Sequence, residues 1–158
     1  MIWKNFAFIF AFIFLIFGQN ILAQDKSENV SEQKAELIQS GSHGGSELAS
    51  LYIDMLRNAM QKNPNSKGVF VIYCGKTCKY GEVEAHIKGL SISLSGKGWK
   101  NSEFAILQGG YKENFTVEYW MVPEKVGLPI PNSTIDIRAV KFKGTFKGKF
   151  VPYNCCEY

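Results

Sequence analysis

The run Val69–Tyr73, with the sequence VFVIY, is the feature that most constrains what this chain can fold into. Its residues are all β-branched or aromatic, which favours a strand. No polar residue alternates with them, so neither face of such a strand suits contact with water. A strand buried on both faces needs a sheet that other elements cover, such as helices. The run therefore predicts an α/β fold.

Two amphipathic helices are predicted, one on either side of this run. Ser46 is a suitable N-cap with Glu47 in the first turn, and the first helix should end at about Lys62, before the sequence NPNSKG. The second helix is predicted over residues 81–95. The apolar residues at helical spacing, which we expect to face the sheet, are Leu48, Leu51, Tyr52, Met55 and Ala59 in the first helix and Val83, Ile87, Leu90 and Leu94 in the second.

Further strands are predicted after the second helix. Phe104–Leu107 and Phe115–Val122 flank the sequence QGGYKEN, and we expect them to pair as an antiparallel hairpin. The helical crossover would make Val69–Tyr73 and Phe104–Leu107 parallel. Leu37 and Ile38 favour a brief edge strand. The predicted fold class is α/β: two helices packed on one small mixed sheet, in the core order helix, strand, helix, strand, strand, with extra C-terminal strands.

The C-terminal tail combines aromatic and basic residues in an alternating pattern, which predicts one or two amphipathic strands. Lysines on such a strand can simply guard a sheet edge. They can also contact an acidic surface, such as anionic lipid headgroups or wall polymers. The lysines retained as candidate binding residues, which alternate with Val140, Phe142, Phe146 and Phe150, are Lys141, Lys143, Lys147 and Lys149.

The N-terminal residues predict export. Lys4 precedes the apolar run Phe6–Phe17, and Ala23 offers a small residue at a cleavage point. The run is shorter than the stretch of about 20 apolar residues that a transmembrane helix needs. We therefore expect a cleaved signal, no transmembrane span afterwards, and a periplasmic or extracellular location. The predicted organisation is a signal peptide at 1–23, a flexible leader at 24–45, the α/β domain at 46–123, and a proline-punctuated linker with a basic tail at 124–158.

The charge and the glycine-rich motif argue against nucleic acid and nucleotides as partners. The formal net charge of +4 is mild, and it falls by one when Lys4 is removed with the signal. A phosphate-binding loop needs Gly, four residues and then Gly-Lys-Ser/Thr. Counting back five residues from the Gly75 of GKT reaches Phe70, not a glycine. We therefore expect neither class of ligand.

The four cysteines are disulfide candidates in an exported chain. Cys74 and Cys78 are separated by three residues, which does not match the Cys-x-x-Cys redox motif. Cys155 and Cys156 are adjacent, and a bridge between neighbours is strained. Two bridges from the loop to the tail are therefore the favoured arrangement, although a Cys74–Cys78 bridge stays open, because four cysteines allow three pairings. Lys76 and Lys79 in this loop should project into solvent.

One part of the chain resembles a known family. The segment LASLYIDMLRNAMQKNPNSKGVFVIYCGKTCKYGEVEAHIKGL, followed by FAILQGGYKENFTVEYWMVP, is similar to divergent members of the OmpA-like C-terminal domain of bacterial envelope proteins. The shared features are a helix ending at Asn-Pro, a strand leading into Tyr-x-Gly, a helix opening with Gly-Glu and a GGY turn. The resemblance covers about Ser46 to Pro123, and it implies the same fold and an envelope setting.

The resemblance also implies where a ligand would bind. Standard members grip the peptidoglycan stem peptide with an Asp in the loop after the first buried strand and an Arg on the following helix. Here the loop Cys74–Gly81 has no Asp, and His86 and Lys88 lie near the Arg position. Lys is a poorer bidentate partner than Arg. His86 and Lys88 are thus candidate binding residues, but peptidoglycan binding of the usual kind is not expected.

No catalytic constellation is predicted. The chain has no Gly-x-Ser-x-Gly elbow. Glu82 and Glu84 are two residues apart on a helix and cannot face each other, and His86 should pair with Glu82 at the surface. The only histidines are His43 and His86, too few for a typical metal site. We therefore expect no catalytic residues, no metal and no cofactor.

These observations favour a non-catalytic exported envelope protein, a binding or interaction module that contacts another envelope protein or a cell-wall polymer. The alternative is a small secreted enzyme, a hydrolase or a thiol-exchange protein, whose site is assembled from loops.

Overall fold

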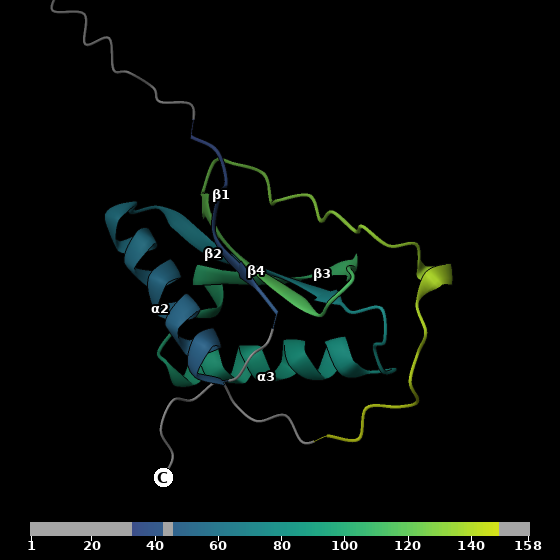
Figure 1. Cartoon of the computed structure of the whole chain (residues 1–158). Helices are drawn as coiled ribbons and strands as arrows, with labels where there is room; N and C mark the ends of the chain where they lie inside the picture. Colours follow the sequence, from purple (N-terminus) through teal and green to yellow (C-terminus); the bar gives the residue numbers. More distant parts are fainter. Residues whose placement is uncertain (1–32, 43–45, 149–158) are drawn as a thin grey trace, which may run out of the picture. The chain divides into compact units, whose positions relative to one another are not determined.

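The computed structural model of the chain describes residues 33–42 and 46–148, and every structural statement below concerns these residues. They form a mixed four-stranded sheet and two long helices, as predicted (Figure 1). The elements in chain order are β1 Glu36–Gly41, α2 Ser46–Lys62, β2 Ser66–Cys74, α3 Glu82–Gly96, β3 Phe104–Tyr111 and β4 Thr116–Pro123, with short 3-10 helices η1 Asn101–Glu103 before β3 and η2 Ile137–Ala139 after β4.

The strand order is β1-β4-β2-β3, so the apolar strand β2 lies in the interior of the sheet. β2 and β3 are parallel, which confirms the prediction from the helical crossover. The predicted hairpin is wrong, because β4 pairs with β2 and β1 rather than with β3. Pairing β4 with β2 covers the second edge of the most apolar strand, whereas a hairpin would leave that edge open.

Both helices cover the same face of the sheet. Phe70, Ile72 and Cys74 of β2 point toward them, together with Val117, Tyr119 and Met121 of β4. The opposite face carries a smaller buried cluster around Val69, Val71, Tyr73 and Val122, against which Ala35, Trp120 and Val126 pack. β2 is therefore buried on both faces, as its composition predicts.

The buried face of α2 differs from the predicted one. Ala49, Ile53 and Leu56 are buried against the sheet, whereas Leu48, Leu51 and Met55 are exposed, with Leu51 at 52%. α2 carries two apolar stripes, and Tyr52 and Ala59 border the buried one. Spacing alone could not decide between two stripes about one residue apart. In α3 the predicted residues Val83, Leu90 and Leu94 are buried and Ile87 packs beside them.

The structure also differs from the predictions at the two ends of the domain. The predicted edge strand at Leu37 and Ile38 is confirmed as β1, which lies inside the segment assigned to a flexible leader. Within 124–148 no strand forms, so the predicted tail strands are wrong for that segment. Only a parallel bridge between Tyr80 and Thr145 occurs there. The tail lies beside a turn rather than a strand, and a turn cannot extend a ladder.

Candidate functional site

The loop that follows β2, residues 74–81, is closed by a disulfide between Cys74 and Cys78, whose Cα atoms are 5.7 Å apart. This separation lies in the usual disulfide range. The favoured bridges from the loop to the tail are therefore wrong for these two residues, which bond to each other. Cys155 and Cys156 lie outside the described residues. Both bonded cysteines are buried, at 4% and 3% exposure.

Several backbone amides of this cysteine loop donate to groups of the protein itself, which separates the loop from a phosphate cradle. The Lys76 amide donates to the Glu113 carbonyl over 3.2 Å, and the Cys78 amide donates to the Gly75 carbonyl over 3.1 Å. Gly75 lies so close to the next connection that a Cβ there would come within 2.8 Å of the Phe115 nitrogen. The glycine of GKT thus serves close packing, because only a residue without a side chain fits there.

Residues 140–147, here called the strap, lie along the cysteine loop (Figure 1). The Lys141 amide donates to the Lys76 carbonyl over 2.8 Å, and the Lys143 amide donates to the Cys78 carbonyl over 2.9 Å. Farther on, Tyr80 donates to Gly144 and accepts from the Phe146 amide, each over 2.9 Å. These bonds join segments more than 60 residues apart and fix the path of the strap.

Aromatic side chains of the strap pack inward. Phe142 stacks on Tyr80 with ring centroids 4.3 Å apart, and it meets Tyr111 edge-on. Phe146 approaches His86, whose ring also lies 4.4 Å from that of Phe115. The predicted exposed pair of His86 with Glu82 is therefore wrong in its setting, because His86 is half-buried among aromatic rings. Burial lowers the pKa of His86, and the charge of Glu82 opposes this only in part.

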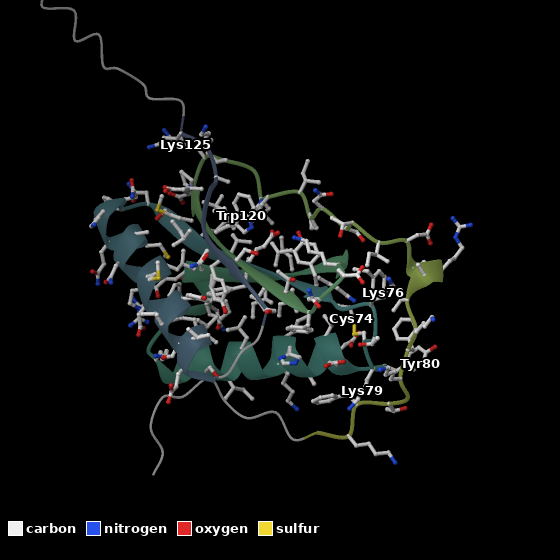
Figure 2. All side chains as sticks on the ribbon, viewed as in Figure 1. Cys74, Lys76, Lys79, Tyr80, Trp120 and Lys125 are labelled. Atoms are coloured by element: carbon white, nitrogen blue, oxygen red, sulfur yellow. A yellow bond between two sulfur atoms is a disulfide. The ribbon has the colours of Figure 1, made fainter. Side chains whose placement is uncertain are left out.

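The loop and the strap, which backbone hydrogen bonds join, both carry exposed lysines, and these lysines are together called the basic face. Lys76 and Lys79 are exposed, as predicted, and Figure 2 shows them with Tyr80 at the same end of the sheet. Glu113 pairs with Lys76 over 3.1 Å. The Glu82 carboxylate accepts from the Lys79 backbone amide over 2.8 Å. The residues of this basic face are Lys76, Lys79, Lys141, Lys143 and Lys147, all exposed.

The predicted site residues are only partly brought together. Lys141, Lys143 and Lys147 lie on the strap, and Lys149 is outside the described residues. Lys88 is exposed on α3 but is two residues from His86, a spacing that puts the two side chains on different sides of the helix. Tyr80, which is 58% exposed and stacks on Phe142, was not among the predicted site residues. In the sequence, only the presence of an aromatic residue in a polar loop could have pointed to Tyr80.

A buried carboxylate on the helix-free face was also missed. Glu118 is 8% exposed and accepts hydrogen bonds from the Tyr73 hydroxyl (3.1 Å), the Trp120 indole (3.0 Å) and the Lys112 ammonium (2.5 Å). The ammonium also lies 4.0 Å from the centroid of the Tyr73 ring. Burial raises the pKa of Tyr73, and Glu118 adds to this effect, while a hydrogen bond from the Asn132 amide opposes it. Through the bond from Asn132 to Tyr73, this network holds the segment that follows β4 against the sheet.

Two further findings concern ligands and membranes. Among the described residues, no group of three or more His, Cys, Asp or Glu side chains is placed to hold a metal ion. In the same part of the chain, no helix has both the length and the apolar character that crossing a bilayer requires.

No family model, no curated protein and no solved structure matches the chain.

Proposed function

We propose that this chain is a non-catalytic, exported binding module of the cell envelope, and that its basic face contacts an anionic polymer of the cell wall. The observation that carries the proposal is the convergence of the loop lysines Lys76 and Lys79 with the strap lysines Lys141 and Lys143 through backbone hydrogen bonds. Segments far apart in sequence thus bring exposed lysines together on one surface, where the five lysines outnumber the acidic Glu113 and Glu82. Such a surface attracts a polyanion over several ångströms.

The chemistry of the face suits a polymer better than a small ligand. Lysine ammonium groups are flexible point charges, whereas arginine forks select particular carboxylate or phosphate geometries. Tyr80 adds an exposed aromatic ring among them. A repeating polyanion supplies many equivalent contacts and needs no single fixed geometry.

The envelope setting is part of the proposal, and three observations are consistent with it. The apolar N-terminal segment is typical of a secretory signal. Residues 46–123 resemble divergent OmpA-like domains, whose usual Asp and Arg ligands are replaced here. The Cys74–Cys78 disulfide is compatible with an oxidising compartment.

Co-sedimentation of residues 24–158 with insoluble cell walls tests this function. We expect binding that is lost when phosphate-linked polymers are removed from the walls by mild acid. Binding should also weaken with salt, because the screening length falls from about 10 Å at 0.1 M to about 3 Å at 1 M. Equal binding to extracted walls, abolished by Lys88→Ala, would instead mean that a peptidoglycan site survives.

A matched pair of variants locates the contact. Removing the strap charges with Lys141→Gln, Lys143→Gln and Lys147→Gln should weaken wall binding about tenfold or more, since each lysine near an anionic surface contributes about 1 kcal/mol. The control removes as many charges elsewhere, with Lys34→Gln, Lys62→Gln and Lys125→Gln, all exposed. Lys125 lies far from the loop in Figure 2. Equal losses in both variants would refute a localised basic face.

A further inference from the structure

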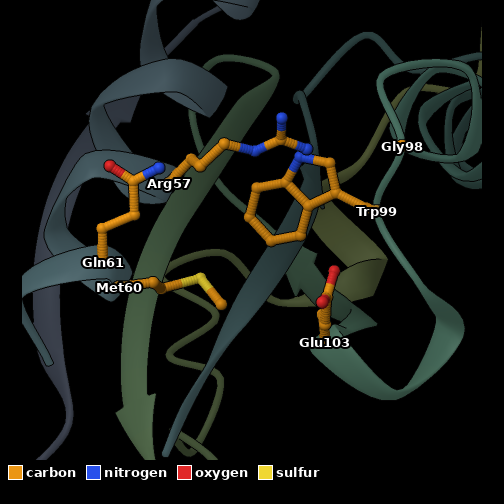
Figure 3. A pocket seen from close by; sticks show the side chains of 6 residues that line it. All are labelled: Arg57, Met60, Gln61, Gly98, Trp99 and Glu103. Atoms are coloured by element: carbon orange, nitrogen blue, oxygen red, sulfur yellow. The ribbon is translucent and has the colours of Figure 1, made fainter. Parts of the chain in front are cut away.

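A pocket of about 360 Å³ lies at the opposite end of β2 from the cysteine loop. Its lining comes from the last turns of α2 and from the connection between α3 and β3 (Figure 3). The lining residues are Arg57, Met60, Gln61, Gly98, Trp99 and Glu103. None of them belongs to the basic face, so the pocket is a separate feature.

Trp99 forms a fixed wall of this pocket. Its side chain is 5% exposed and meets the rings of Phe70 and Phe104 edge-on, at 6.0 and 6.4 Å. Gly68 makes room for it, because a Cβ at that position would come within 2.9 Å of the indole. Residues of β2 and β3 thus hold the indole of Trp99 in one orientation.

The indole N–H of Trp99 is the one buried side-chain nitrogen or oxygen without a hydrogen bond in the described part of the chain. Buried indole N–H groups ordinarily find an acceptor. Leaving a donor unsatisfied away from water costs free energy. Figure 3 shows the guanidinium of Arg57 beside the indole nitrogen, and a guanidinium is itself a donor.

Arg57 reaches over Trp99, with its guanidinium carbon 5.0 Å from the ring centroid. Its Nη2 donates to the Lys97 carbonyl over 2.8 Å. Among the described residues no ion pair involves Arg57, and Asp54, three residues earlier on α2, pairs with Lys97 over 3.6 Å. A guanidinium has five N–H donors, so most of its capacity remains for a ligand.

We propose that this pocket binds a small monocarboxylate, held by Arg57 and by the Trp99 indole N–H. A carboxylate has two oxygens and can accept the guanidinium fork on both, while the indole N–H adds a third donor. The N–H is covered in this structure, so the guanidinium must shift onto the ligand and uncover it. Met60 and the indole offer apolar contact to the rest of the ligand.

Glu103 limits the ligand to one negative charge. Its carboxylate lines the same pocket and accepts from the Lys100 backbone amide over 2.9 Å, which holds it in position. A second carboxylate on the ligand would meet this negative charge and be repelled. The site therefore favours an acid whose remaining groups are neutral or positively charged, such as the C-terminal end of a short peptide.

The test uses N-acetylglycine as the probe and the indole N–H resonance of Trp99 as the readout. In ¹H–¹⁵N spectra of residues 24–158, with the peak assigned by Trp99→Phe, we expect a saturable shift of the Trp99 signal and none of the Trp120 signal. N-acetylglycinamide, which lacks the carboxylate, should leave both unchanged. Succinate, a dianion, should bind at least about tenfold more weakly than the probe because of Glu103.

Variants of Arg57 complete the test. Arg57→Gln should abolish the saturable shift, and Arg57→Lys should weaken binding because an ammonium cannot form the fork. The matched control is Arg138→Gln, an exposed arginine that pairs with Asp136 away from the pocket. The proposal is overturned if the Trp99 signal does not move by about 50 mM probe, well above the millimolar Kd expected for so small a ligand. A shift that survives Arg57→Gln and Arg57→Lys equally would overturn it as well. Neither result bears on the proposed wall binding, which concerns the basic face at the other end of the sheet.

Discussion

The ring of Phe142 lies on the ring of Tyr80, with centroids 4.3 Å apart and planes inclined by only 13°. This stack joins the strap to the cysteine loop at the point where their backbones also exchange hydrogen bonds. Removing it should release the strap while leaving the sheet in place. The basic face depends on that contact, because three of its lysines are carried by the strap.

Phe142→Ala is therefore expected to destabilise the strap locally. The half-buried ring loses its stacking and part of its burial, together worth about 1–2 kcal/mol. Hydrogen exchange at the Lys141, Lys143 and Phe146 amides should become faster, while amides of β2 keep their protection. Phe142→Tyr keeps the stack and serves as the control. Unchanged exchange in the alanine variant would show that the backbone bonds alone hold the strap.

Glu118→Gln should lower the free energy of unfolding by about 2 kcal/mol, because the Lys112 ammonium would lose its buried partner. Urea denaturation measures this loss. The control is Glu113→Gln, which breaks the exposed Lys76 pair and should cost no more than about 0.5 kcal/mol. A double-mutant cycle with Tyr73→Phe should reveal coupling, since both residues share one network. Equal, small losses in both glutamine variants would contradict the structural role given to Glu118.

The lowered pKa of His86 predicts a pH dependence of stability. Its folded-state pKa lies below the ordinary value of about 6.5, so the unfolded chain takes up a proton first as the pH falls. The contribution of His86 is present above about pH 6.5 and is lost progressively as the pH falls below that value. Thermal unfolding of the parent and of His86→Gln at pH 8 and pH 5.5 measures it. The parent should lose more stability between the two pH values, and identical losses would rule out a role for His86.

The Cys74–Cys78 bridge should resist reduction in the folded protein, since both sulfur-bearing residues are buried. Mass spectrometry of an unreduced digest is expected to recover these two cysteines in one linked peptide. Cys74→Ser with Cys78→Ser should cost about 2 kcal/mol, the value expected for so short a loop. Rapid thiol-disulfide turnover that disappears with this variant would favour the secreted-enzyme hypothesis over a binding module.

The sequence predicted the elements better than their arrangement. β2 and α3 could be placed because their apolar patterns depend on local spacing. The position of β4 between β1 and β2 depends on which edges remain open after the crossover, and no local pattern contains that information. The exposed side of α2 was misjudged because Leu51 and Ile53 both fit a helical stripe, and only packing selects one.

The candidate site was predicted only in part for the same reason. The lysines of the strap and of the loop were each visible in the sequence as exposed charges. Their convergence rests on single backbone contacts such as Lys141 to Lys76, between segments that have no complementary pattern. The Trp99 pocket had no sequence signal, because its lining residues come from separate elements and form no motif along the chain.

The position of β4 also governs when this chain can fold. The sheet gains an interior only when β4 enters between β1 and β2, so β1 has no partner until residues 116–123 are available. Pairings between segments this far apart form slowly, because loop closure must come first. A nascent chain that emerges from its N-terminus therefore stays open until nearly the whole domain has been made.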